Sequence, residues 1–179
     1  MTFLPPDGAP WRPSMADSFG VPDNVFGDVP ERFYGALGRI AALGALVEMR
    51  LGQVCIELEQ VPETDVAGLQ MKPLLDRFEN EGKKRVAAGR SLPEALVLLV
   101  EAAQEAMSRR NEVVHSLWPN PTLEGAKGWR TVRPKKRVDA SNPVVWVDVD
   151  ERRLLALIAD LVRIARELRD IVSATNALT

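Results

Sequence analysis

The only histidine of the 179-residue chain, His115, lies in a stretch whose residue types and spacing suit acid–base chemistry. Arg110 and Asn111 precede it by about one helical turn. An imidazole can accept or donate a proton near neutral pH. An arginine can donate two parallel hydrogen bonds to phosphate oxygens and stabilise the charge that develops there, and Asn111 could hold the imidazole or the substrate. These three side chains predict cleavage of RNA phosphodiester bonds without a metal ion.

The helix that carries these residues limits how they can meet. At about 100° per residue, His115 lies roughly 40° around the helix from Asn111 but roughly 140° from Arg110. One helix therefore cannot direct Arg110 and His115 at the same small atom. A second copy of the helix, related by a two-fold axis, could complete the cleft. The geometry predicts a composite site at the interface of a homodimer.

Arg110 and His115 also have structural explanations. Arg110 occupies a position in an apolar stripe, and a guanidinium there needs an anionic partner or a wet cleft. Glu48 or Glu57 of the first helix could supply that partner. His115 would lie at the end of its helix, where the helix dipole favours a histidine and its side chain could cap carbonyl groups.

Apolar residues recur every three or four positions in four segments, which predicts an all-α fold, a bundle of four to five helices. The helices are expected over residues 31 to about 61, 69–88, 91–117 and 151–177. Asp28 and Ser91 are each followed three residues later by a glutamate, which is the spacing of a capping box. Three glycines of the first helix, which predict close helix–helix approach, are Gly35, Gly38 and Gly44.

A β-hairpin is predicted over about residues 128–149, before the last helix. Trp129–Arg133 and Val144–Val149 are rich in β-branched and aromatic residues, and a turn-rich stretch separates them. Trp118, Trp129 or Trp146 could stack on bases, although core or interface anchoring is the commoner role of a tryptophan. The basic residues expected to grip an RNA backbone, which a solvated loop would explain equally well, are Arg130, Arg133, Lys135, Lys136 and Arg137.

Residues 1–30 are predicted to form a proline-rich, irregular arm outside the bundle, which fills residues 31–179. Prolines and glycines punctuate the arm and prevent a regular helix or strand. Its aromatic residues would pin it to the domain surface or to a partner subunit.

Composition excludes several classes of protein. The formal net charge is -2, so any surface that attracts nucleic acid must be local. The single cysteine excludes an internal disulfide and a cysteine-rich metal site. The first residues lack the pattern of a signal peptide, and no apolar run reaches the length of a membrane span, so we expect a cytoplasmic protein without a membrane anchor.

The motif and its place resemble the HEPN superfamily. Arg110-Asn111-Glu-Val-Val-His115 matches the family's pattern of Arg, a polar residue and then His, with four residues between Arg110 and His115. Arg109 satisfies the longer spacing that the family also allows. The family fold is a bundle of four or five helices with the motif near the end of the third. The resemblance covers about residues 31–178 and explains neither the arm nor the hairpin.

The resemblance implies a function and partners. HEPN proteins are commonly dimers, and many are metal-independent RNases of toxin–antitoxin, abortive-infection or CRISPR-linked systems that leave cyclic phosphate ends. By resemblance, Arg110 and His115 would be catalytic and Asn111 a polar accessory. The partners would be RNA, a second copy of the chain and an antitoxin or other inhibitor protein, with no cofactor.

Two other functions fit the same residues. The chain could be a non-catalytic HEPN-like module that binds a nucleotide or a partner protein in the same cleft. It could also be a structural dimerisation domain in which the arginine and the histidine only hold the bundle together.

Overall fold

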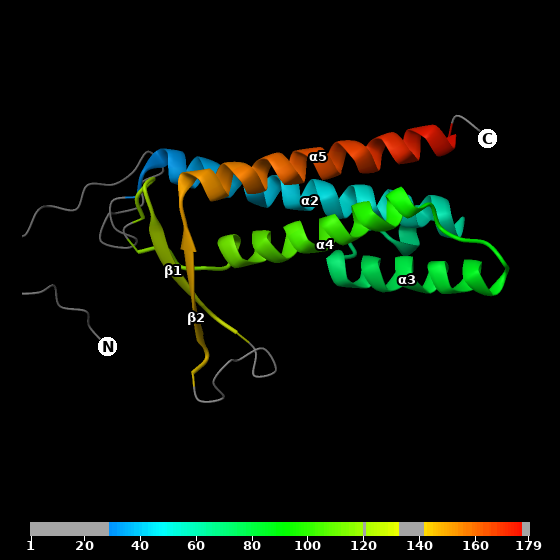
Figure 1. The fold of residues 1–179 in the computed structure, drawn as a ribbon, viewed down its shortest axis with the longest axis horizontal. Helices are drawn as coiled ribbons and strands as arrows, with labels where there is room; N and C mark the ends of the chain where they lie inside the picture. Colours follow the sequence, from blue (N-terminus) through cyan, green and yellow to red (C-terminus); the bar gives the residue numbers. More distant parts are fainter. Residues whose placement is uncertain (1–28, 120, 133–141, 177–179) are drawn as a thin grey trace, which may run out of the picture.

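The structure, a computed structural model, describes residues 29–119, 121–132 and 142–176. It is a helical bundle with a small β-hairpin before the last helix, as predicted (Figure 1). The elements in chain order are α2 (Glu31–Glu59), the short 3-10 helix η1 (Glu63–Asp65), α3 (Met71–Ala87), α4 (Glu94–Val114), β1 (Ala126–Thr131), β2 (Val144–Val149) and α5 (Glu151–Asn176). The predicted N-terminal arm, except for Val29 and Pro30, lies outside the described residues.

Helices α2 and α5 lie side by side along most of their length and form the most extensive packing of the bundle (Figure 1). Helix α4 packs against both of them, and α3 covers only the end of the bundle remote from the hairpin. The C-terminal end of α4 therefore points toward the hairpin and is not covered by α3 (Figure 1).

The apolar stripes predicted from the sequence form the core. Ile40, Leu51, Leu161 and Leu168 are completely buried. Each such side chain contributes roughly 1.5–3 kcal/mol through its removal from water. The three-and-four spacing of these residues is the reason that α2 and α5 meet along a continuous line.

The start of α4 and the end of α2 differ from the prediction. The capping box at Ser91 is wrong: α4 begins at Glu94, its N-cap residue is Pro93, and no side chain caps it. Pro93 has an extended ψ of 131° and disfavours a helical conformation at the preceding residue. Helix α2 ends at Glu59 because Gln60 adopts a left-handed conformation, with φ 54°, shortly before Pro62.

The predicted close helix–helix approach at Gly35, Gly38 and Gly44 is confirmed only at Gly44. A Cβ atom on Gly44 would lie 2.8 Å from Nε of Arg110, which belongs to α4. The nearest atom to such a Cβ on Gly35 belongs to Arg39 of the same helix, and nothing lies within 4 Å at Gly38. Gly38 is exposed, which explains why it has no helical neighbour.

The hairpin is antiparallel and slightly longer at its start than predicted. Ala126 pairs with Val149 and Trp129 with Trp146. Its inner face packs on the bundle through Gly128, where a Cβ atom would lie 2.5 Å from the ring of Trp118. Trp118 is buried, so this tryptophan is a core anchor, the commoner of the two roles considered for it.

Within the residues that the structure describes, none of the helices combines the length and the apolar character needed to span a bilayer.

Candidate functional site at the end of helix α4

The three candidate catalytic residues lie together at the C-terminal end of α4. Arg110 and Asn111 belong to its last turn, and His115 is its C-cap residue, whose backbone N–H donates to the carbonyl oxygen of Asn111 at 3.2 Å. The predicted helix ran to about Leu117, so His115 closes the helix instead of lying within it.

Arg110 lies across the backbone of α2. Its Cγ, Cδ and Nε atoms occupy the space that a side chain at position 44 would fill. Nη1 donates a hydrogen bond of 2.9 Å to Oδ1 of Asn111. Glycine at 44 and the amide at 111 thus fix the two ends of this side chain.

No carboxylate oxygen of the described residues lies within 4.0 Å of the Arg110 guanidinium, so an ion pair with Glu48 or Glu57 is not what holds it. Glu48 instead accepts a hydrogen bond of 3.0 Å from the backbone N–H of Met71. Nε of Arg110 is buried without a partner in the described residues, and Nη2 also lacks one there. Nη2 therefore keeps donors for an anionic ligand, whereas Nε is covered by α2.

The neighbouring arginine, Arg109, differs in its partner. Its Nη2 donates to Oδ2 of Asp160 on α5 at 2.8 Å. Its Nε is buried without a partner, as in Arg110, so the two side chains differ only at their Nη atoms. Both residues satisfy a family spacing, but the carboxylate of Asp160 already neutralises Arg109. Arg110 is consequently the better candidate for binding phosphate.

His115 is exposed, and no side chain of the described residues forms a hydrogen bond or ion pair with its ring. At this end of α4 the carbonyl oxygens of Glu112 and Val113 accept hydrogen bonds from Oγ of Ser116 and Nε1 of Trp118, so the His115 ring is not the cap. The ring instead remains open to solvent and to a ligand.

The hydrogen bond between Arg110 and Asn111 reduces the angular separation between the Arg110 guanidinium and His115 that the sequence predicts. The Cα atoms of Arg110 and His115 differ by roughly 140° around the helix. Asn111 lies between them, and it draws Nη1 of Arg110 toward the side of the helix that carries His115. The long arginine side chain thus spans part of the angle that the backbone imposes.

The predicted RNA-binding residues fall into two groups. Arg130 is partly buried on the inner face of the hairpin, where its Nη2 lies 3.1 Å from Oε1 of Glu112. This ion pair ties the hairpin to α4. The other four, Arg133, Lys135, Lys136 and Arg137, lie outside the described residues.

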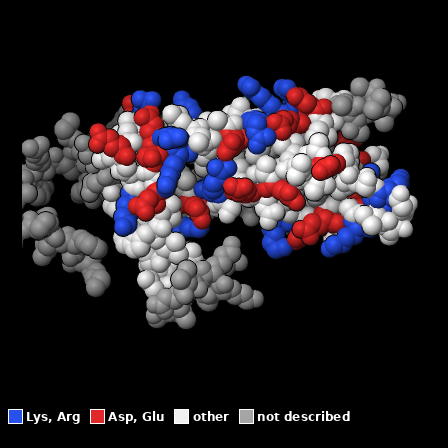
Figure 2. Space-filling model, viewed as in Figure 1, with Lys and Arg blue, Asp and Glu red and all other residues white. Residues whose placement is uncertain are grey.

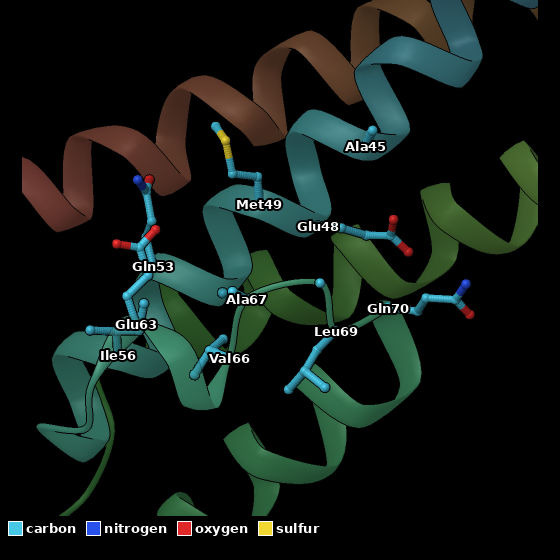
Figure 3. A pocket seen from close by; sticks show the side chains of 12 residues that line it. Ala45, Glu48, Met49, Gln53, Ile56, Glu63, Val66, Ala67, Leu69 and Gln70 are labelled. Atoms are coloured by element: carbon cyan, nitrogen blue, oxygen red, sulfur yellow. The ribbon is translucent and has the colours of Figure 1, made fainter.

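Arg110 lines none of the four hollows found on the described residues, of which two are the larger. One of about 340 Å³ lies between α4, β2 and α5, and its lining includes Arg109 and Arg153. Another of about 320 Å³ lies on α2 and the connection that leads to α3 (Figure 3). Glu48 and Glu63 are the charged residues of its lining, so that hollow does not suit a phosphate.

Charge on the bundle is mixed. On the face shown in Figure 2, acidic and basic side chains alternate over the helices, and neither sign forms a continuous track. Attraction of an RNA backbone must therefore be local, as the net charge also indicates.

No protein-family model, curated protein or solved structure matches this chain. Among the described residues, no group of three or more His, Cys, Asp and Glu side chains gathers in a way that could hold a metal ion. Function must be inferred from the chain's own residues.

Gly44 is the member of the site that sequence reasoning missed. The pattern contained a signal, because Gly44 occupies an apolar position of α2 just as Arg110 does in α4. A gap in one stripe and an oversized residue in another are complementary, but only the packing of α2 on α4 shows that they face each other.

Proposed function

We propose that this chain is a metal-independent endoribonuclease of the HEPN type, with a composite arginine–histidine site at a homodimer interface and a role as a toxin or phage-defence component. The observation that carries the proposal is Arg110. It is oriented by Asn111, lacks a carboxylate partner among the described residues and lies one turn from the exposed His115.

The chemistry requires a base, an acid and a stabiliser of negative charge. The ribose 2′-oxygen attacks the adjacent phosphorus as its proton moves to an imidazole, the bond from phosphorus to the 5′-oxygen breaks, and the leaving oxygen takes a proton. The products are a cyclic phosphate and a 5′-hydroxyl. Arg110 stabilises the non-bridging oxygens in the transition state. His115 takes the proton of the 2′-oxygen as a base and, once protonated, can return it to the leaving oxygen as an acid, so one His115 and one Arg110 complete a site.

The spare donors of Arg110 support this assignment because they match phosphate geometry. A guanidinium with its Nη2 edge open can donate to oxygens that gain charge during the reaction. The exposed ring of His115 is accessible to a polymer as large as RNA.

The test is cleavage of a labelled RNA by the wild type, by Arg110→Ala and by His115→Ala, each shown to be dimeric. We expect the wild type to leave cyclic phosphate ends in the presence of a chelator and both variants to be inactive. Growth arrest on expression of the wild type, but not of His115→Ala, would support the role as a toxin.

Mixing the two inactive variants tests the composite site. If one subunit supplies Arg110 and the other His115, each mixed dimer contains one intact site, and an equal mixture recovers about a quarter of the wild-type activity. An equal mixture that stays inactive while mixed dimers form would contradict a site shared in this way.

A further inference from the structure

The outer face of the hairpin carries a row of apolar side chains that begins two residues after His115. The backbone of Leu117 forms an antiparallel bridge with Trp129, and Trp129 pairs with Trp146 of β2. Residues directly opposite each other in antiparallel strands share a face. Leu117, Trp129 and Trp146 therefore form one row across three strand segments, which we term the aromatic row.

The tryptophans of this row face away from the bundle, while Leu117 also lines a hollow of about 130 Å³ beside the start of α2. Trp118 and Gly128, which are the chain neighbours of Leu117 and Trp129, meet on the inner face. Successive residues of a strand alternate between faces, so the aromatic row must lie on the other side. Trp146 is 57% exposed and Leu117 41% exposed.

A cation accompanies the exposed indole. Nζ of Lys127 lies 5.4 Å from the ring centroid of Trp146. Asp148 is the cross-strand partner of Lys127, so the neighbourhood of the ring carries one charge of each sign. Because the ammonium group lies over one face of the indole, a base can stack only on the opposite face, and a phosphate of the same strand can contact the ammonium group.

The size of the row argues against a protein partner. Its exposed area is on the order of 200–300 Å², given that a tryptophan offers at most about 250 Å². A stable protein interface covers roughly 800 Å² on each partner. A single nucleobase, by contrast, needs little more than the face of one or two rings.

The row is also close enough to the candidate site to act on the same strand of RNA. Consecutive Cα atoms are about 3.8 Å apart and paired strands about 5 Å, so the Cα atom of Trp146 lies at most about 19 Å from that of His115. An RNA strand held at one point would therefore reach the other within a few nucleotides.

We propose that the aromatic row is a stacking subsite for unpaired bases of the RNA substrate, with Trp146 as its principal ring. This subsite rests on the proposed ribonuclease function and adds a requirement to it. The bases within a few nucleotides of the cleaved bond must be unpaired, because a base within a duplex cannot lie flat on the indole.

The experiment measures binding separately from cleavage. A fluorescent oligo(U) RNA, about 12 nucleotides long, is titrated with His115→Ala protein in which Trp146 is intact or replaced. We expect Trp146→Ala to weaken binding roughly 5- to 150-fold, which is the range of base–aromatic stacking, and Trp146→Tyr to retain most of the affinity. The salt dependence should not change, because no phosphate contact is lost.

Leu98 supplies the matched control. It is also 57% exposed and apolar, but it lies on the first turns of α4, remote from the hairpin. Leu98→Ala should bind the RNA as its parent does. A duplex of the same length should bind with an affinity that Trp146→Ala does not change.

The subsite is overturned if Trp146→Ala binds oligo(U) as tightly as its parent, or if the parent does not bind oligo(U) at low salt. It is also overturned if Trp146→Ala changes the oligomeric state, because the row would then be a contact between copies of the chain. These results differ from failure of the proposed function. Cleavage by a wild type whose RNA binding does not depend on Trp146 removes the subsite alone. Binding that depends on Trp146 without any cleavage removes the ribonuclease alone.

Discussion

Two arginines at opposite ends of this bundle, Arg77 and Arg110, have different partners. At the junction of α2 and α3, Arg77 donates from Nε and Nη2 to the two carboxylate oxygens of Glu59, at 2.9 and 2.7 Å. At the end of α4, Arg110 has an amide as its only partner among the described residues. Both arginines are partly buried, so burial does not explain the difference.

The comparison separates residues that hold the fold from residues kept available for a ligand. The carboxylate of Glu59 raises the pKa of Arg77 through its hydrogen bonds, which means that the pair stabilises the charged form. Arg110 differs from Arg77 because its Nη1 donates to an amide and none of its Nη atoms contacts a carboxylate of the described residues. The buried Nε without a partner does not distinguish Arg110, because Arg109 and Arg130 have one as well.

Replacement of the two adjacent arginines of α4 gives the largest expected contrast. Arg110→Met should reduce RNA cleavage by a factor of roughly 100 to 1,000 or more, because a donor to the transition state is lost. Arg109→Met removes only the partly exposed ion pair with Asp160 and should keep cleavage within a few-fold of the wild type. Both rates are measured on the same RNA. Equal losses in the two variants would remove the distinction drawn between them.

The fold could be predicted from the sequence to a large extent because it follows from local periodicity. Apolar residues at three-and-four spacing produced the helices, and β-branched runs produced the hairpin. The helix ends were less predictable: the serine of an apparent capping box at Ser91 was overridden by Pro93, which must precede the first turn in an extended conformation.

The sequence could indicate candidate residues but not their partners. The spacing made Arg110, Asn111 and His115 the candidates, and the structure places them at one end of α4. It did not reveal that Gly44 opens space for one arginine while Asp160 neutralises the next. Those partners are 66 and 51 positions away along the chain, and only the packing of α4 between α2 and α5 brings them together.

A substitution of Arg77 tests the α2–α3 end of the bundle. Arg77→Met should lower the free energy of unfolding by roughly 1–3 kcal/mol, because it leaves the largely buried Glu59 carboxylate without its partner. Cleavage of RNA at a temperature where the variant is folded should remain within a few-fold of the wild type. Denaturant unfolding and a cleavage assay measure the two effects. A variant that is stable but inactive would show that this end of the bundle also serves the reaction.

Gly44 offers a smaller and more selective perturbation. Alanine in a helix is more favourable than glycine by up to about 1 kcal/mol, but its Cβ at this position requires Arg110 to move. We expect Gly44→Ala to change the free energy of unfolding by less than about 1 kcal/mol while cleavage falls by a factor of ten or so.

Gly38→Ala is the matched control for this substitution, since nothing lies within 4 Å of the added methyl group. Gly38→Ala should raise the free energy of unfolding by up to about 1 kcal/mol and leave the rate of RNA cleavage unchanged. If both variants cleave RNA at the wild-type rate, the position of the Arg110 side chain against α2 has no part in activity.

The smallest expected effect concerns Cys55, which belongs to the paired end of the bundle. Its thiol is buried and donates to the carbonyl oxygen of Leu74 at 3.6 Å. Burial, followed by the nearby charge of Glu59, raises its pKa to about 11 from an ordinary 9.0, although Arg77 opposes the shift. The folded protein therefore keeps this proton at pH values where the unfolded chain loses it.

The contribution of Cys55 to the stability of the protein decreases as the pH rises. The protonated thiol contributes fully to the free energy of unfolding below about pH 9, and the contribution is lost as the pH rises toward 11. Between pH 8 and pH 10 the contribution falls by about 1 kcal/mol. Unfolding curves of the wild type and Cys55→Ala at several pH values isolate this contribution, because the other alkaline groups are common to both. The wild-type advantage should shrink by that amount over this range. A constant difference would show that the thiol is not sealed from water, and that the α2–α3 end is less completely packed than its ion pair implies.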